Sequence, residues 1–259
     1  MYAEERQQAI ATLVIRQGRA SVAELAQAYD VTTETVRRDL AALDKAGLVR
    51  RVHGGAVPAR SLALVEQDVN ERDTTRADHK DAIAAAAHEF FPLSGSSVLL
   101  DAGTTTSRIA AAIPTDRALV VVTNSVPIAG RLAGVPSVTL QLLGGRVRGL
   151  TQAAVGDAAL AVLDCLRVDI AFIGTNGISA RHGLSTPDPD EAAIKRAMVR
   201  SANYVVVASD SSKIGREELV SFAPLSSVDA LITDPEISDA DHAELAGLGI
   251  EIVLAGGPA

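Results

Sequence analysis

Seven short apolar runs recur through the last two thirds of the chain and limit its fold more than any other feature. They lie at 97–100, 119–122, 137–143, 169–173, 204–208, 230–233 and 251–255. Uninterrupted runs rich in β-branched residues are typical of strands that are buried on both faces. Helical patterns lie between several of them, at 79–91, 156–166 and 190–202. This alternation predicts an α/β domain with a mostly parallel sheet.

Glycine, serine, threonine and asparagine follow five of these runs. The polar segments are 101–107, 123–125, 144–145, 174–177 and 209–213. Ligands of open α/β sheets bind outside the carboxyl ends of the strands. A helix that begins at Thr104 or Thr105 would also offer free N–H groups to an anion. Each loop taken singly is explained as an ordinary turn or cap, but five at matching strand ends predict a site for a phosphate on a polyhydroxyl body.

The first sixty residues follow a different pattern, that of three short helices. Apolar residues at helical spacing predict the first helix within 4–18. Ser21 and Glu24 have the spacing of a capping box for the second helix, and Thr32 is placed to cap the third. The third helix has an apolar stripe of Val36, Leu40 and Leu43. Two short helices joined by a tight turn indicate a helix-turn-helix.

The side of the third helix away from its apolar stripe carries residues suited to DNA. These are Thr33, Thr35, Arg37 and Arg38. The first half of a recognition helix enters the major groove, where hydroxyls and arginines contact base edges and phosphates. Residues 48–58 alternate apolar and basic around two glycines and predict a β-hairpin wing. Arg50, Arg51 and His53 would then lie along the DNA backbone, although His53 alone is also explained as an ordinary loop residue.

The distribution of charge fits two parts with different partners. The formal net charge is −8, yet residues 1–60 hold nine Lys and Arg against seven Asp and Glu. The rest of the chain holds fifteen against twenty-five. A basic surplus also occurs on a merely solvated helix face, but beside the helix-turn-helix pattern it indicates an anionic partner. We therefore expect a DNA-binding domain at 1–57, a linker at 58–78 with some helical or strand-like portions, and a sensor domain at 79–259.

Composition argues against several other classes of protein. No apolar run approaches the ~18 residues of a membrane span, and the amino terminus is charged from its fourth residue, so we expect a cytoplasmic protein. The five histidines have no paired metal-ligand spacing, and we expect no metal, no cofactor and no catalytic residue. Cys165 is interpreted as a small buried residue on a helix, with a nucleophile as the alternative.

Residues 21–57 resemble the DNA-binding head of the DeoR family of bacterial transcription regulators. The resemblance rests on Val-Arg-Arg-Asp-Leu at 36–40 and Arg-Val-His-Gly-Gly at 51–55. The stretches 100–106, 121–129, 172–179 and 183–198, among others, resemble the sensor domain of the same family. The resemblance implies a sensor domain that is similar in fold to ribose-5-phosphate isomerase. It also implies that this sensor domain binds a phosphorylated sugar, which modulates DNA binding. It also implies that Asp39 orients neighbouring arginines.

The resemblance assigns effector-binding roles to residues at the strand ends. Asp101 would accept hydrogen bonds from sugar hydroxyls, and Lys213 would supply a cation for the phosphate. The remaining assignments are Gly103, Thr104, Thr105 and Thr106 for the phosphate, Asn124 and Asn176 for the polyol, and Glu191 or Lys195 to close the site. Glu191 and Lys195 are equally explained as an i, i+4 ion pair. Arg146 and Arg148 fit phosphate partners or subunit contacts, and the sequence does not decide between them.

The sequence therefore predicts a homodimeric or larger repressor of sugar uptake or catabolism genes, with double-stranded operator DNA and a phosphorylated sugar as partners. Stretches such as 144–157 and 182–198 resemble actinobacterial regulators of fructose and phosphotransferase-system sugar uptake. A sugar-phosphate isomerase with an appended DNA-binding head is the alternative. It is disfavoured because isomerisation needs a general base, and the clustered carboxylates of the isomerase loops are missing here. The operator, the sugar and the sign of the response are left open.

Overall fold

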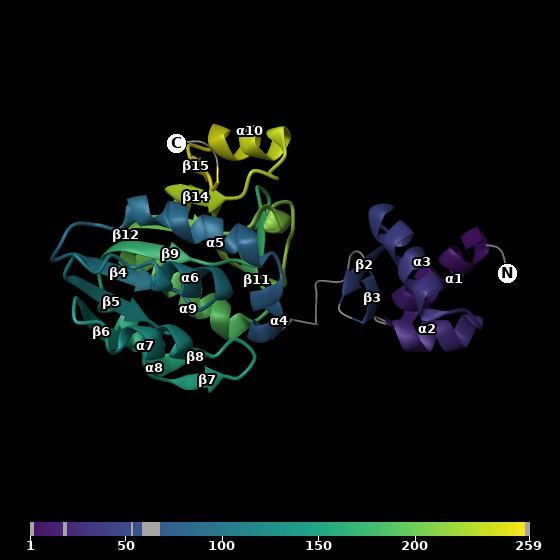
Figure 1. Cartoon of the computed structure of the whole chain (residues 1–259), viewed down its shortest axis with the longest axis horizontal. Helices are drawn as coiled ribbons and strands as arrows, with labels where there is room; N and C mark the ends of the chain where they lie inside the picture. The colour runs from purple at the N-terminus through teal and green to yellow at the C-terminus, as the bar shows by residue number, and fades with distance from the viewer. Residues whose placement is uncertain (1–2, 18–19, 53, 59–67, 257–259) are drawn as a thin grey trace. The chain divides into compact units, whose positions relative to one another are not determined.

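The structure is a computed structural model that describes residues 3–17, 20–52, 54–58 and 68–256. The chain divides into two compact units, Met1–Glu66 and Gln67–Ala259 (Figure 1).

The first unit is a winged helix-turn-helix, as predicted. Its elements are α1 (Ala3–Gln17), β1 (Ala20–Ser21), α2 (Val22–Tyr29), α3 (Thr33–Lys45), β2 (Val49–Val52) and β3 (Gly55–Pro58). Ser21 and Glu24 form the expected capping box, and the Thr32 hydroxyl accepts a hydrogen bond from the Thr35 backbone N–H at 3.2 Å. The apolar stripe of α3 is buried against α1 and α2, with Val36, Leu40 and Leu43 packed on Ile10, Val14 and Leu25.

The wing is an antiparallel hairpin in which β2 pairs with β3. Its two glycines have different roles. Gly54 has a φ of +78°, a turn conformation that favours glycine. Gly55 lies so close to β1 that a Cβ there would stand 2.2 Å from the Ala20 carbonyl oxygen. The third strand, β1, was not predicted. His53 lies outside the described residues.

The second unit is built on a seven-stranded parallel sheet in the order β15-β14-β12-β9-β4-β5-β6. Its strands are β4 (Ser97–Leu100), β5 (Leu119–Thr123), β6 (Val138–Leu142), β9 (Val168–Ile173), β12 (Ala202–Ala208), β14 (Ala230–Thr233) and β15 (Glu251–Leu254). Every one of them falls on an apolar run, and all six pairings are parallel. The predicted α/β fold with a mostly parallel sheet is confirmed.

Helices cover both faces of the sheet, which makes three layers (Figure 1). One face is covered by α5 (Ala77–Ala86), α6 (Thr104–Ala111) and α7 (Val126–Leu132). The other is covered by α8 (Asp157–Leu163), α9 (Pro189–Ser201) and α10 (Asp239–Gly247). Val98 and Leu100 point into the first core and Leu99 into the second. Two apolar faces explain why the central strands are continuous apolar runs.

Two expectations about burial are wrong. The edge strands β6 and β15 are not buried on both faces, since Leu142 is 48% and Leu254 is 41% exposed. Cys165 is exposed rather than buried. It follows the end of α8, where its backbone N–H donates to the Val162 carbonyl at 3.1 Å, so it has left the apolar face of that helix.

Shorter elements that the apolar pattern did not predict surround the sheet. They are α4 (Val69–Thr74), the hairpin of β7 (Arg146–Arg148) and β8 (Ala153–Val155), and an antiparallel sheet of β10 (Gly177–Ser179), β11 (Gly183–Thr186) and β13 (Val220–Ala223). Among the described residues, no helix is long and apolar enough to cross a membrane.

The end of the expected linker, 58–78, belongs to the second unit, which starts at Gln67. Asp68 caps α4 by accepting hydrogen bonds from the backbone N–H groups of Asn70 and Glu71. The Val69 N–H donates to the Leu150 carbonyl at 2.9 Å. Helix α4 is therefore a helical portion of the expected linker, and these contacts attach it to the second unit.

Candidate functional site

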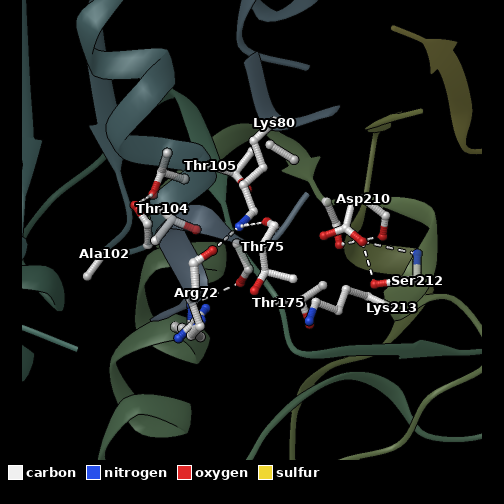
Figure 2. A pocket seen from close by; sticks show the side chains of 16 residues that line it. Arg72, Thr75, Lys80, Ala102, Thr104, Thr105, Thr175, Asp210, Ser212 and Lys213 are labelled. Atoms are coloured by element: carbon white, nitrogen blue, oxygen red, sulfur yellow. Dashed lines mark hydrogen bonds between the residues drawn. The ribbon is translucent and has the colours of Figure 1, made fainter. Parts of the chain in front are cut away.

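A polar hollow lies at the carboxyl ends of β4, β9 and β12 (Figure 2). The ends of these strands and the loops after them line it with residues 102–106, 174–175 and 208–213 (except Ser211). Three helices contribute the rest of the lining. Arg72 lies in α4 and Thr75 is its C-cap, while Lys80 belongs to α5 and Lys195 to α9. Because the strands are parallel, their carboxyl ends share one edge of the sheet, where the sequence predicts a site.

The amino terminus of α6 forms one side of this hollow. Gly103 is its N-cap and provides no side-chain hydrogen bond to the first turn. The first N–H groups of a helix have no partner within the helix, and the helix dipole adds positive charge there. Thr104, Thr105 and Thr106 are buried around this end of the helix. The arrangement suits an anion such as a phosphate.

Cations outnumber acids in the lining of the hollow. Lys80, Lys195, Lys213 and Arg72 face one carboxylate, that of Asp210, among the described residues. Burial lowers the pKa of Lys80 to about 8, although Asp210 opposes the shift. Burial also lowers the pKa of Lys213. This surplus of positive charge in a partly enclosed lining attracts an anionic ligand.

Lys80 and Lys213 differ in their bonding. The Lys80 ammonium group donates to the backbone carbonyls of Arg72 and Thr75, the second at 2.7 Å (Figure 2). In the part of the chain that the structure describes, the Lys213 ammonium group has no hydrogen bond or ion pair. Lys213 is therefore available to a ligand without loss of an existing contact.

Lys195 is tied to groups beneath the hollow. Its ammonium group pairs with the buried Asp101 carboxylate, donates to the Gly174 carbonyl at 2.9 Å and stands 5.7 Å from the centre of the Phe222 ring. Asp101 also accepts from the Gly174 N–H at 3.0 Å. This buried pair joins the ends of β4 and β9 to α9.

The structure brings six of the predicted effector residues to the hollow. They are Gly103, Thr104, Thr105, Thr106, Lys195 and Lys213. Asp101 lies behind Lys195. Asn124 accepts from the Ala102 N–H and donates to the Ala154 carbonyl, both at 3.1 Å. Asn176 accepts from the Thr186 hydroxyl at 3.3 Å. These three side chains are engaged with the protein and do not line the hollow.

Glu191 also lies away from the hollow, and it does not pair with Lys195. Its carboxylate accepts from the Thr151 hydroxyl and from Arg148 at 3.1 Å. Arg148 pairs with Asp188 as well, at 3.0 Å. Arg146, on the same hairpin, pairs with Asp190. The i, i+4 alternative is wrong, and both arginines join the β7–β8 hairpin to the start of α9.

The lining residues that the sequence did not name, or signalled only in part, include Asp210, Ser212, Lys80 and Arg72. Asp210 and Ser212 belong to the polar segment 209–213 after a predicted strand, and the sequence pattern does not show which of its residues face the hollow. Lys80 lies in the predicted helix at 79–91, but the helical pattern does not show that its side chain points into the hollow. Arg72 lies in the expected linker, where no sequence signal indicated a site. No cluster of three or more His, Cys, Asp or Glu able to hold a metal occurs among the described residues.

The first unit presents most of its predicted DNA-binding side chains to solvent. Thr33, Arg37, Arg38 and Arg51 are exposed, and Thr35 and Arg50 are partly buried. Arg37 forms an exposed ion pair with Glu34 at 3.5 Å. The Thr35 hydroxyl lies 2.9 Å from that of Thr32, which caps α3. This side of α3 is open to a partner.

Asp39 lies on the opposite side of α3 and is buried. It pairs with Arg6 of α1 at 2.6 Å and accepts from the Gln7 amide at 3.0 Å. The arginine that it orients is therefore distant in sequence rather than a neighbour on α3.

Comparisons with known proteins cover both units. The family model "DeoR C terminal sensor domain" matches residues 75–235, and "DeoR-like helix-turn-helix domain" matches residues 6–61. The HTH-type transcriptional regulator GlpR of Haloferax volcanii is 37% identical over 253 residues, 98% of each chain. The uncharacterized HTH-type transcriptional regulator FruR of Bacillus subtilis is 34% identical over 91% of this chain and 93% of that protein.

The glycerol-3-phosphate regulon repressor of Escherichia coli K12 is 33% identical over 89% of this chain and 90% of that protein. Among solved structures, ribose 5-phosphate isomerase A from Methanocaldococcus jannaschii is similar with a TM-score of 0.40 and 18% identity, over 54% of this chain and 55% of that chain.

Proposed function

Because the chain belongs to the DeoR family of transcriptional regulators, we propose that it is a repressor whose operator binding is changed by a phosphorylated sugar or polyol. The genes that it regulates are proposed to serve the uptake or breakdown of such compounds. The protein itself is proposed to act in the cytoplasm. The name of the Escherichia coli relative, a glycerol-3-phosphate regulon repressor, supports this ligand class.

The head is proposed to bind double-stranded DNA through α3 and the wing. Thr33, Thr35, Arg37 and Arg38 would face the major groove, with Arg50, Arg51 and His53 along the backbone. Support comes from the exposure of Arg37 and Arg38 on the side of α3 opposite its buried stripe.

The hollow is proposed to bind the effector, and one observation carries this part. Three lysines and an arginine converge with the amino terminus of α6 at the carboxyl edge of the sheet. We place the phosphate at Gly103–Thr106 near Lys80 and Lys213. Asp210 and Ser212 would hydrogen-bond the hydroxyls of the body, since a carboxylate and a hydroxyl together accept and donate. Asp101 and Lys195 support these loops from beneath.

An isomerase is not favoured by this arrangement. Proton abstraction next to a carbonyl needs a general base within hydrogen-bond reach of the substrate. In the described residues the lining carries one carboxylate, Asp210, which accepts from the N–H and hydroxyl of Ser212. The Asp101 carboxylate is bonded to Lys195 and Gly174. The relatives above are named as regulators.

A thermal-shift panel on the full chain tests the proposal. The panel holds inorganic phosphate, glycerol 3-phosphate, ribose 5-phosphate, fructose 1-phosphate and fructose 6-phosphate, with the unphosphorylated compounds as controls. We expect at least one phosphorylated compound to raise the melting temperature, because a ligand that binds the folded state stabilises it. Lys213→Met should abolish the rise, and Arg131→Met, at an exposed cation that does not line the hollow, should retain it. A rise that survives Lys213→Met would place the ligand elsewhere.

A further inference from the structure

Helix α4 is held in place almost without apolar burial. It has six residues, and none of them is buried. Helices this short are not stable alone in water. Its position therefore depends on polar contacts with the rest of the second unit, and besides the bond from Val69 to Leu150 two of these contacts come from the surroundings of the hollow.

Lys80 is the first of these contacts. Its ammonium group is buried and donates to the carbonyls of Arg72 and Thr75, at the carboxyl end of α4. An ammonium group has three donors, so one remains beyond these two bonds. Lys80 also lines the hollow (Figure 2). A single cation thus faces both α4 and the ligand space.

Arg108 is the second contact and belongs to α6, whose amino terminus borders the hollow. Its guanidinium group pairs with the Asp73 carboxylate and donates to the Asp73 carbonyl at 3.1 Å. It also donates to the Thr104 carbonyl at 3.2 Å, in the first turn of α6. The helix that would hold the phosphate is therefore joined directly to α4.

Helix α4 is itself a wall of the hollow, since Arg72 and Thr75 line it. A ligand that contacts them can do so only while α4 is docked. A ligand that binds one state better than another shifts the population toward that state. Contact with Arg72, Thr75 and Lys80 must therefore favour the docked state over any state in which α4 has moved away.

We propose that a phosphate-bearing ligand in the hollow stabilises the docked position of α4 through Lys80 and Arg72, and that α4 is the element by which occupancy reaches the DNA-binding head. The inference rests on the proposed function of the hollow. Helix α4 is the first described element after residues 59–67, which join the two units in sequence. Along the chain, α4 is therefore the described element of the second unit that follows the head most directly.

Hydrogen–deuterium exchange on the full chain tests the first half. The backbone N–H groups of residues 69–72 are all hydrogen-bonded, to Leu150 and Asp68. We expect exchange at 69–72 to slow when the phosphorylated compound with the largest thermal shift is added, with inorganic phosphate as the minimal probe. The unphosphorylated compound should have no effect. A chain without tryptophan also allows Asn70→Trp as a single fluorescent reporter on α4.

Asp68→Ala provides the reciprocal test. Asp68 caps α4 but does not line the hollow, so its removal loosens α4 without deleting a ligand contact. Linkage then requires weaker ligand binding, and we expect a ~2- to 5-fold loss of affinity, measured by calorimetry. The loss of the Asp68 carboxylate would by its charge alone strengthen the binding of an anion. A weaker affinity therefore reports the loosening of α4 and not the change in charge. Ser238→Ala removes the matching cap of α10 and should leave affinity unchanged.

The outcomes separate this inference from the function on which it rests. Slower exchange at 69–72 together with weaker binding by Asp68→Ala supports it. Ligand binding with unchanged exchange at 69–72, or wild-type affinity in Asp68→Ala, overturns it and leaves the effector site standing. If no compound of the panel binds the wild-type chain, both are overturned.

Discussion

Single residues determine which ligand the hollow can accept. Burial of an ammonium group disfavours its charged form, and the pKa of the group falls as a result. Lys80 shows this, with a pKa of about 8, and the pKa of Lys213 moves in the same direction. Asp210 compensates only in part, because its carboxylate also pairs with Arg76 at 3.1 Å. A bound phosphate would supply the missing negative charge.

The first prediction concerns proton uptake on binding. Burial lowers the pKa of Lys80, and the positive charges of Arg108, Lys213 and Arg72 lower it further. The negative charge of Asp210 raises it. A phosphate beside Lys80 raises that pKa, so binding near pH 8 should take up protons, and affinity should fall as the pH rises above about 8. Calorimetry at pH 8 in two buffers of different protonation enthalpy measures the number of protons. Lys80→Met should reduce it, and proton release by the wild-type chain would contradict the placement of the phosphate.

The second prediction concerns Arg37 and Arg38 on α3. Both side chains are exposed, so Arg37→Ala or Arg38→Ala should weaken operator binding without unfolding the head. Each lost phosphate contact should make the slope of log affinity against log salt shallower by ~0.9. Anisotropy titrations with a duplex selected from a random pool would measure both quantities, with Arg131→Ala as the control. Wild-type affinity in both mutants would mean that another surface binds DNA.

At the scale of helices and strands, periodicity predicted what depends on burial and missed what depends on polar contacts. All seven parallel strands were predictable because the sheet has helices on both faces. The edge strands have the same composition as the central ones, so their exposure was not visible in the pattern. Helix α4 buries no side chain and therefore leaves no apolar period.

The same distinction applies to the candidate site. The polar strand ends predicted the place of Gly103–Thr106 and Lys213, because parallel strands bring their carboxyl ends to one edge. Asn124 follows a strand in the same way, yet its amide bonds the backbone of Ala102 and Ala154. The direction of the Asn124 side chain depends on a segment thirty residues away in sequence. The local pattern of residues around Asn124 does not show which distant segment packs against it.

The third prediction tests the link between α1 and α3. Asp39 is buried and bonded to Arg6 and Gln7, so Asp39→Ala leaves two polar groups of α1 without their acceptor. We expect the melting temperature of the head to fall by ~5 °C or more, and operator binding to fall with it. Exchange rates of the α3 amides report on the head alone. Glu34→Ala, at an exposed acid of the same helix, is the control, and equal effects of the two changes would contradict the structural role of Asp39.

For the whole molecule, the small size of the head predicts a symmetric assembly. One recognition helix with one wing contacts too few base pairs for a specific operator, and paired heads on repeated half-sites overcome this limit. We expect light scattering to show a homodimer or a larger homo-oligomer, and footprints to cover two half-sites. A monomer with full operator affinity at nanomolar concentration would refute the prediction.

The last prediction joins the two units. If the hollow is the effector site, ligand and DNA must be coupled, and such couplings typically amount to ~1–3 kcal/mol, or ~5- to 150-fold in affinity. Thr105 and Lys213 both line the hollow, and neither carries the ion pairs that hold its surroundings together. Thr105→Ala combined with Lys213→Ala should therefore fold and bind operator DNA with wild-type affinity when no ligand is present.

The same double variant should no longer respond to ligand, because a ligand that does not bind cannot shift the equilibrium between DNA-bound and free arrangements. Anisotropy titrations of operator DNA, with and without the effector found by thermal shift, measure both properties. Thr115→Ala combined with Arg131→Ala also replaces one threonine and one cation by alanine, at exposed positions that do not line the hollow, and should keep the response. A double variant that still responds at the wild-type effector concentration would place the sensor site elsewhere. One that no longer binds DNA at all would mean that Thr105 and Lys213 support the fold rather than the ligand.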